Sequence, residues 1–209
     1  MEISNVIDIL SKHVEKYDVP VAELIEVQTR DPFKVLVSTI LSAQTKDQTT
    51  AKVSKKLFSV IDKPSDLKKL SIEDIEEIIR SANYHKTKAR NIKRLENLKQ
   101  VPDTMEELLK LSGVGRKTAN IVLSVSFKKP AIAVDTHVHR ISNRLGFVKT
   151  KTREQTEQEL MKKLPKEYWI KYNYLLVAFG QNLCTPISPH CSKCLISNYC
   201  EKIGVQTSR

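Results

Sequence analysis

Apolar residues recur through most of this chain at intervals of three and four, and this spacing restricts its fold more than any other feature. Near the start, Ile3, Val6, Ile7, Leu10 and Val14 follow it, which puts them on one face of an α-helix. The 209 residues include only five glycines, and leucine, isoleucine, valine, lysine and glutamate are frequent. This composition argues against an all-β protein. We therefore predict an all-α fold of about ten helices with essentially no sheet.

Local signals place further helices. Asp31 precedes Pro32, which suits the first position of a helix continuing to Leu41. Ser71 caps the next clear run, and Thr104 with Glu107 has the spacing of a capping box. Further helices are expected over residues 49–61, 72–82, 104–111, 118–127, 136–145, 157–164 and 168–183.

A glycine-containing turn joins two of these helices. It lies in Leu-Ser-Gly-Val-Gly-Arg-Lys-Thr-Ala-Asn at residues 111–120, so Gly113, Val114, Gly115 and Arg116 form its tip. Glycine tolerates positive φ, which lets backbone amides approach an anion closely, and the N-terminus of the following helix adds partial positive charge. The turn therefore suits a DNA phosphate, although a tight helix-turn-helix without that function fits it equally well.

Lys117 and Asp135 are the candidate catalytic residues. Lys117 follows the turn directly, where Arg116 and the positive end of the helix favour the neutral, nucleophilic amine. An equally sensible interpretation is a lysine that merely binds a phosphate. Asp135 follows the apolar stretch Ala131–Val134 and precedes a helix, so its simplest role is an N-cap. A capping carboxylate has a fixed direction, and capping is therefore compatible with catalysis.

The charge balance favours a polyanionic partner. Thirty-five lysines and arginines against 24 acidic residues give a formal charge of +11, which fits nucleic acid. The opening residues carry an acid where a secretory signal would carry bases, and no apolar run reaches membrane-spanning length. We expect a protein of the cytoplasm that has no membrane contact.

A basic run with two aromatic rings is a second candidate DNA contact. Residues 83–91 read Asn-Tyr-His-Lys-Thr-Lys-Ala-Arg-Asn. Rings can stack on bases while amines meet phosphates, so we predict that Tyr84 and His85 contact nucleic acid. The alternative for each single charge is a solvated helix face.

All four cysteines lie close to the C-terminus, at Cys184, Cys191, Cys194 and Cys200. Structural disulfides are rare inside cells, so this clustering indicates a metal site. Four thiolates can hold one zinc ion or one iron–sulfur cluster, and zinc is the generic expectation.

Several motifs together resemble the endonuclease III family of DNA glycosylases. They are Leu-Ser-Ala-Gln-Thr at residues 41–45, the turn sequence at residues 111–120, Ala-Val-Asp-Thr-His-Val at residues 133–138, and the cysteine spacing C-x6-C-x2-C-x5-C. The motifs occur in the family's order, and the resemblance covers residues 30–200. It implies two helical domains with a DNA cleft between them: residues 25–130, with six helices and a helix-hairpin-helix, and residues 1–24 plus 131–209.

The resemblance also implies an activity on damaged double-stranded DNA. The enzyme would be a DNA N-glycosylase and abasic-site lyase that flips an oxidised pyrimidine out of the duplex. Lys117 would attack the sugar C1′, and Asp135 would support charge on the sugar. Gln44 would fill the gap left by the base, and the turn around Tyr84 would enter the base stack. The family usually has glycine and then a bulky apolar residue in this wedge, whereas this chain has Asn83 and Tyr84.

The same resemblance moves the metal assignment from zinc to a 4Fe-4S cluster with a structural role. Family members often carry basic residues between the first two cysteines. Residues 185–190 contain no lysine or arginine, so Lys193 and Lys202 would have to meet phosphates there.

Two alternatives remain at this point. Mismatch glycosylases of the same superfamily, which remove uracil or thymine opposite guanine, share the turn and the cluster but usually lack the lysine. A non-catalytic helix-hairpin-helix module would need neither Lys117 nor Asp135. We expect a monomeric, nucleoid-associated protein of a prokaryote, and the lysine- and isoleucine-rich composition hints at an archaeal source.

Overall fold

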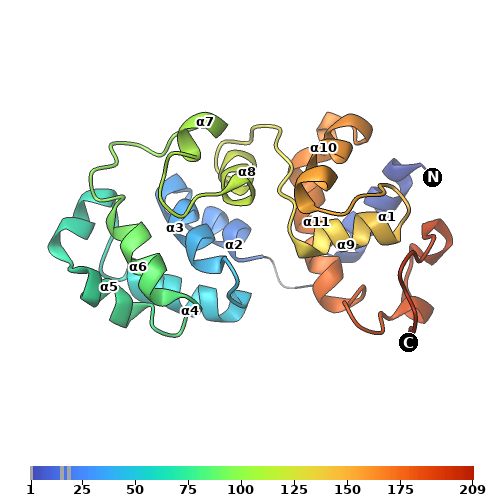
Figure 1. Ribbon diagram of the computed structural model, residues 1–209, viewed down its shortest axis with the longest axis horizontal. Coiled ribbons are helices and arrows are strands. Elements are labelled where there is room, and N and C mark those ends of the chain that lie inside the picture. Colours follow the sequence, from blue (N-terminus) through green and yellow to red (C-terminus); the bar gives the residue numbers. More distant parts are fainter. Residues whose placement is uncertain (1, 15–16, 18–19) are drawn as a thin grey trace. The chain divides into compact units, whose positions relative to one another are not determined.

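The computed structural model describes residues 2–14, 17 and 20–209, and within these ranges it contains eleven α-helices, four short 3-10 helices and no strand (Figure 1). The predicted all-α class is therefore confirmed. The α-helices are α1 (Ile3–Val14), α2 (Val21–Thr29), α3 (Pro32–Ser42), α4 (Asp47–Phe58), α5 (Ile72–Ile78), α6 (His85–Lys93), α7 (Met105–Leu108), α8 (Arg116–Val125), α9 (Thr136–Arg144), α10 (Arg153–Lys163) and α11 (Trp169–Asn182). The 3-10 helices are η1 (Pro64–Lys69), η2 (Lys166–Tyr168), η3 (Cys191–Lys193) and η4 (Ser197–Tyr199).

The chain forms two compact units. The first comprises residues 1–20 and 130–209, and the second comprises residues 21–129. The sequence placed these boundaries at 24/25 and 130/131, and residues 1, 15–16 and 18–19 of the first unit lie outside the described residues. The described part of the second unit holds α2 to α8. The sequence predicts six helices there, and α2 is the additional one.

The first unit is built around α11, which packs against both α1 and α9. Apolar side chains of these helices meet in one core, with Ile7, Val138 and Leu176 fully buried. Two aromatic residues of α11 also have their polar atoms satisfied. Trp169 donates through Nε1 to the Leu164 carbonyl at 2.8 Å, and the Tyr172 hydroxyl lies 3.0 Å from that of Ser142. Buried rings of this kind combine large apolar contact with a defined orientation.

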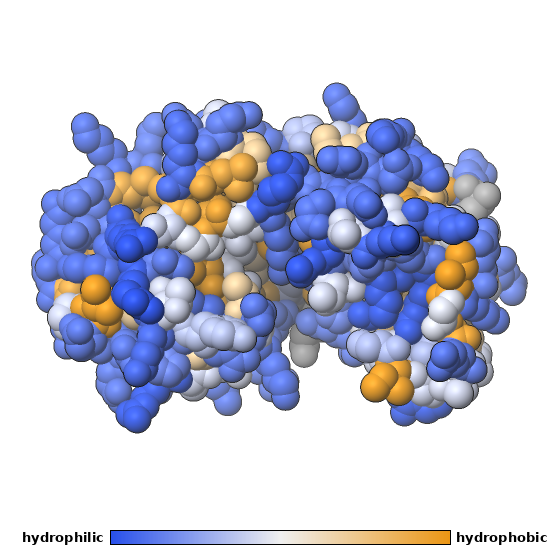
Figure 2. Space-filling view, in the orientation of Figure 1, coloured by the Kyte–Doolittle hydropathy of each residue, from blue (hydrophilic) through white to orange (hydrophobic). Residues whose placement is uncertain are grey.

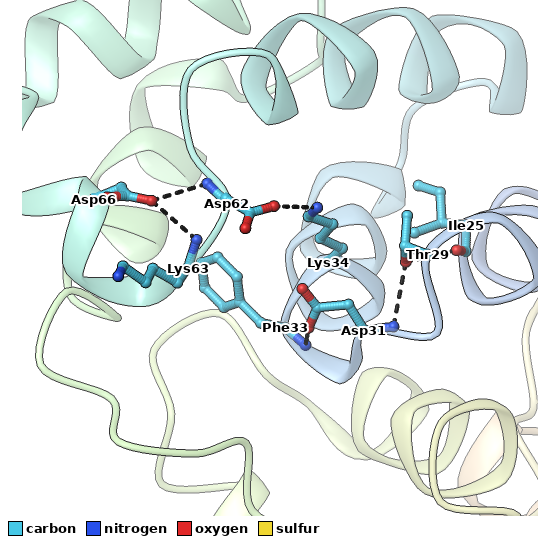
Figure 3. Close-up of polar contacts among 8 residues, drawn as sticks. All are labelled: Ile25, Thr29, Asp31, Phe33, Lys34, Asp62, Lys63 and Asp66. Atoms are coloured by element: carbon cyan, nitrogen blue, oxygen red, sulfur yellow. Dashed lines mark hydrogen bonds and ion pairs between the residues drawn. The ribbon is translucent and has the colours of Figure 1, made fainter.

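The second unit is built around α3, which contacts α2, α4, α6 and α8. The start of α3 agrees with the sequence signal: Pro32 is its first residue, and Asp31 Oδ1 accepts a hydrogen bond from the Phe33 amide at 2.8 Å (Figure 3). Lys34 on the same helix pairs with Asp62 at 2.6 Å. The residues from Val35 to Leu41 are all buried, so α3 provides a rigid support for the turn that follows it.

The visible surface is mainly hydrophilic, with small and scattered apolar patches (Figure 2). Such a surface is normal for a protein in water, because isolated apolar side chains at the surface are common. Among the described residues, no helix is both long and apolar enough to cross a membrane.

Candidate functional site

The glycine turn joins α7 to α8 and forms a helical hairpin in the second unit. Gly113 has a φ of +80°, and a Cβ at this position would lie 2.6 Å from Asn91 Nδ2 on α6. Gly115 is the N-cap of α8, and no atom lies within 4 Å of a Cβ built there. The two glycines therefore serve different purposes: the first allows a left-handed turn against α6, and the second keeps the approach to the helix N-terminus open.

The remaining residues of the turn suit a contact in which backbone amides bind a phosphate. Val114 is buried at 7% exposure, so its contribution to a DNA contact would come from its backbone. Arg116 is exposed at the first position of α8. Arg94, at the C-cap of α6, donates to the Ser112 hydroxyl at 3.1 Å and thereby fixes the turn to the end of α6. Amides at such a helix start, together with the arginine, favour an anion.

Lys117 is the second residue of α8 and is partly buried. Glu23 interacts electrostatically with Lys117, because α2 packs against α8, and also with Asp47 at the start of α4. Burial raises the pKa of Glu23, in the first turn of α2, from 4.5 to about 7. The nearby Asp47 raises it further, whereas the Glu23 backbone, Lys117 and Lys128 act in the opposite direction. A carboxyl group that changes protonation near neutral pH therefore lies close to the candidate nucleophile.

Asp135 is the N-cap of α9 in the first unit, which confirms its predicted structural role. Its Oδ1 accepts hydrogen bonds from the amides of His137 and Val138, each at 2.8 Å. The carboxylate is partly buried, and Oδ2 takes part in neither bond. The cap therefore fixes the direction of the side chain while using only one of its oxygens.

The structure brings together Gln44 and Tyr84, two of the predicted DNA contacts. Gln44 follows α3, Tyr84 precedes α6, and both have left-handed backbone with φ of 55° and 57°. Asn83 links the two turns, because its Nδ2 donates to the Gln44 carbonyl at 2.5 Å. Tyr84 is 64% exposed, which is unusual for a large aromatic ring and suits a stacking residue. His85 is less accessible, since its Nδ1 lies 3.4 Å from Glu76 Oε1 on α5.

The four cysteines line one pocket in the first unit. Apolar residues of α9 and α11 form part of its wall, and Arg144 on α9 lies beside it. The Arg144 guanidinium donates to Cys184 Sγ at 3.4 Å and to the carbonyls of Thr185 and Pro186 at 2.7 and 2.6 Å. It therefore holds the beginning of the cysteine loop against the helical core. The expected phosphate contacts Lys193 and Lys202 are both exposed.

Two of the four partly buried thiols have raised pKa values. Burial raises the pKa of Cys194 to about 11 and also raises the pKa of Cys200, and the neighbouring cysteines act in the same direction. Such thiols stay protonated at neutral pH unless a metal draws off the proton. Among the described residues, no three His, Cys, Asp or Glu side chains are grouped as around a single metal ion.

The structure thus groups the predicted residues into four places: the hairpin with Lys117, the paired turns of Gln44 and Tyr84, the cap at Asp135, and the cysteine pocket. Lys117 belongs to the second unit, and Asp135 belongs to the first. Glu23 and Lys88 are not among the residues predicted from the sequence. Glu23 lies on α2, which no predicted helix covers, and Lys88 lies in the basic run for which DNA contact is predicted, with a solvated face as the alternative for each single charge.

The chain is similar to known DNA repair proteins. Residues 37–166 match the family described as HhH-GPD superfamily base excision DNA repair protein. Endonuclease III of Thermotoga maritima is 52% identical over 177 residues, covering 82% of this chain and 83% of the relative. A solved non-covalent endonuclease III–DNA complex is 38% identical, with a TM-score of 0.86 over 96% of this chain and 94% of that chain. A trapped endonuclease III–DNA covalent intermediate has a TM-score of 0.85 and 38% identity, covering 96% of this chain and 95% of that chain.

Proposed function

Because the chain belongs to the HhH-GPD superfamily of base excision DNA repair proteins, with endonuclease III as its relative, we propose that it removes oxidised pyrimidines from duplex DNA and then cuts the strand. The observation that carries the proposal is Lys117 in the first turn of α8, directly after the glycine hairpin. A lysine there can reach a sugar whose phosphate is held by the hairpin amides. One polypeptide would then act both as DNA glycosylase and as abasic-site lyase.

The reaction would begin with attack of the Lys117 amine on C1′ of the flipped nucleotide. The new C1′–N bond replaces the glycosidic bond, and the base leaves with the bonding electrons and gains a proton. Opening of the sugar ring gives a Schiff base between C1′ and Nζ. Loss of a proton from C2′ then breaks the C3′–O bond and cuts the strand by β-elimination. Such covalent catalysis divides one difficult step into easier ones.

Asp135 would support the positive charge that develops on the sugar as the base leaves. Its carboxylate is held by two amide donors on Oδ1, so little reorganisation is required when the charge appears. The same group can assist proton transfer. Gln44 would occupy the space vacated by the flipped base, and Tyr84 would enter the stack. Flipping costs a few kcal/mol and is less costly for a damaged base.

We propose that the cysteine pocket holds a 4Fe-4S cluster rather than a zinc ion. In a four-iron cluster each thiolate binds a different iron, so the four ligands surround a larger group than zinc, whose bonds to sulfur are about 2.3 Å long. The common pocket, its apolar wall and the Arg144 contact to Cys184 Sγ support this choice. Cys184, Cys191, Cys194 and Cys200 would hold the cluster, which would fix the loop near the DNA backbone.

The second candidate is a glycosylase for uracil or thymine opposite guanine. The chain's tyrosine in the wedge, where the family usually has an apolar residue, is the observation that favours testing it. Lysine at position 117 is the observation against it, because those relatives usually lack the amine. We further propose that the protein acts as a monomer on double-stranded DNA in the cytoplasm of a prokaryote.

The test is a cleavage assay on duplexes with thymine glycol, with a G·U or G·T mismatch, or with a preformed abasic site. We expect excision of thymine glycol and a β-elimination product from both the glycol and the abasic duplex. Lys117→Gln should remove both activities and keep DNA binding. Strand cleavage that persists in Lys117→Gln, or excision limited to the mismatches, would refute the assignment. Iron and sulfide analysis of the purified protein decides between cluster and zinc.

A further inference from the structure

Lys88 on α6 is nearly inaccessible, with only 4% of its surface exposed. Its ammonium group donates to the carbonyls of Leu41 and Ala43 at 2.6 and 2.7 Å and to the Thr45 hydroxyl at 2.8 Å. These acceptors enclose Gln44, whose φ of 55° is unfavourable for a residue with a Cβ. A single buried cation therefore ties α6 to the turn that carries Gln44.

Asn83 provides a second connection between the same segments. Its side chain donates to the Gln44 carbonyl at 2.5 Å, and its amide donates to the Thr45 hydroxyl at 3.2 Å. Thr45 thus accepts hydrogen bonds from both Asn83 and Lys88. A glycine at position 83, as the family pattern has it, could supply the amide but not the side-chain donor.

The same helix also supports the glycine hairpin. Asn91 lies against Gly113, and Arg94 at the C-cap of α6 donates to Ser112. Lys88, Asn91 and Arg94 are spaced by three, so they lie along one side of the helix on successive turns. The wedge, the Gln44 turn and the hairpin are therefore all fixed to one rigid element of the second unit.

We propose that Lys88 and Asn83 hold the turns of Gln44 and Tyr84 in one preformed arrangement, so that both side chains enter the DNA together. The proposal rests on the proposed function, since it assumes that the side chains of Gln44 and Tyr84 both contact the opened base stack. Ordering the two turns during folding removes that entropic cost from DNA binding. Lys88 and Asn83 are accordingly positioning residues, which act through the Gln44 turn.

Protonation of Lys88 is compatible with this role. Burial lowers the pKa of Lys88 to about 8, so the ammonium form still predominates at neutral pH. The three oxygen acceptors favour that form. The cluster-loaded protein can therefore be tested near pH 7 with the Lys88 hydrogen bonds intact.

The experiment compares two single-turnover rates in each variant. One is excision of thymine glycol from a duplex, which requires flipping and filling of the gap. The other is borohydride trapping on a preformed abasic site, which lacks the base and opens at lower cost. We expect Lys88→Met and Asn83→Gly to slow excision by about 10-fold to 100-fold, because misplaced positioning groups have effects of this size, and to slow trapping by less than about threefold.

Lys55→Met is the matched control, because Lys55 is exposed on α4 and its substitution makes the same change in charge and shape. It should leave the ratio of the two rates unaffected. Gln44→Ala should add little further loss in the Lys88→Met background, since two changes at one coupled site are not additive.

The proposal is refuted if folded Lys88→Met and Asn83→Gly slow both rates by the same factor, if neither rate changes, or if the Gln44→Ala effect is fully additive. Thr45→Val, which removes the shared acceptor, gives a third test if Lys88→Met does not fold. Absence of both activities in the wild-type protein would instead refute the proposed function.

Discussion

Replacing Asp135 with asparagine separates its structural role from its chemical one. Asparagine caps helices about as well as aspartate, because its carbonyl oxygen can accept the same amide bonds. In Asp135→Asn the two 2.8 Å hydrogen bonds from the amides of His137 and Val138 can still form, and only the negative charge is removed. Alanine at the same position removes the cap as well.

The two variants should therefore differ in stability and agree in activity. Loss of one charge at a helix N-terminus costs about 0.3–1 kcal/mol, whereas loss of the cap costs about 1 kcal/mol, with a range of roughly 0.5–2. In a chain of this size each kcal/mol corresponds to a shift in Tm of about 2–4 °C. Removal of a preorganised electrostatic group slows the chemical step by about 100-fold to 1,000-fold.

Thermal unfolding and single-turnover excision of thymine glycol measure the two effects. Asp135→Asn should lose only a few degrees and still lose most of its excision rate. Asp135→Ala should be less stable and equally slow. Excision by folded Asp135→Asn at the wild-type rate would show that Asp135 is only a helix cap, and the reasoning on its charge would be wrong.

Three further predictions concern other parts of the site. Glu23→Gln should flatten the dependence of stability on pH. The pKa of Glu23 is raised from 4.5 to about 7, so this group contributes stability that is fully present below pH 4.5 and is lost as pH rises through 7. At roughly 1.4 kcal/mol per pH unit the contribution is about 3–4 kcal/mol. Gly113→Ala should cost more than about 1 kcal/mol in urea unfolding, because its φ is +80° and its Cβ would lie 2.6 Å from Asn91; Gly115→Ala should keep stability and weaken DNA binding in a titration. Arg144→Lys should lower iron content per chain, because lysine cannot reproduce the guanidinium contacts to the cysteine loop.

Each of these has a clear contrary result. An unchanged pH profile in Glu23→Gln would show that the carboxyl group is ordinary and well solvated. Equal stability of the two glycine variants would contradict the difference in their surroundings. Full iron content in Arg144→Lys would show that the guanidinium is dispensable for holding the loop.

Local signals sufficed for the parts of the fold that depend on neighbouring residues. Asp31 with Pro32 at the start of α3, and Asp135 at the start of α9, could be predicted because a cap needs only the next few amides. The apolar spacing of α1 gave its bounds from Ile3 to Val14. The motif resemblance supplied the candidate roles of Lys117 and Asp135, which spacing alone left open.

The parts that could not be predicted depend on contacts across long stretches of sequence. Lys88 looked like one more surface lysine, and only its bonds to residues more than 40 positions away show that it is buried. Glu23 was missed because α2 is short and its raised pKa depends on α4 and α8 packing around it. The left-handed backbone of Tyr84 likewise has no local signal, since tyrosine rarely adopts it.

The central claim is that the Lys117 amine is the nucleophile. Its most direct test is borohydride reduction of the full-length, cluster-loaded protein with a duplex carrying an abasic site, followed by mass spectrometry of the cross-linked peptide. We predict one covalent adduct, on the side chain of Lys117, with a mass that matches a reduced Schiff base to the sugar. An adduct on another residue, or no adduct from a folded protein that binds the duplex, would contradict the claim.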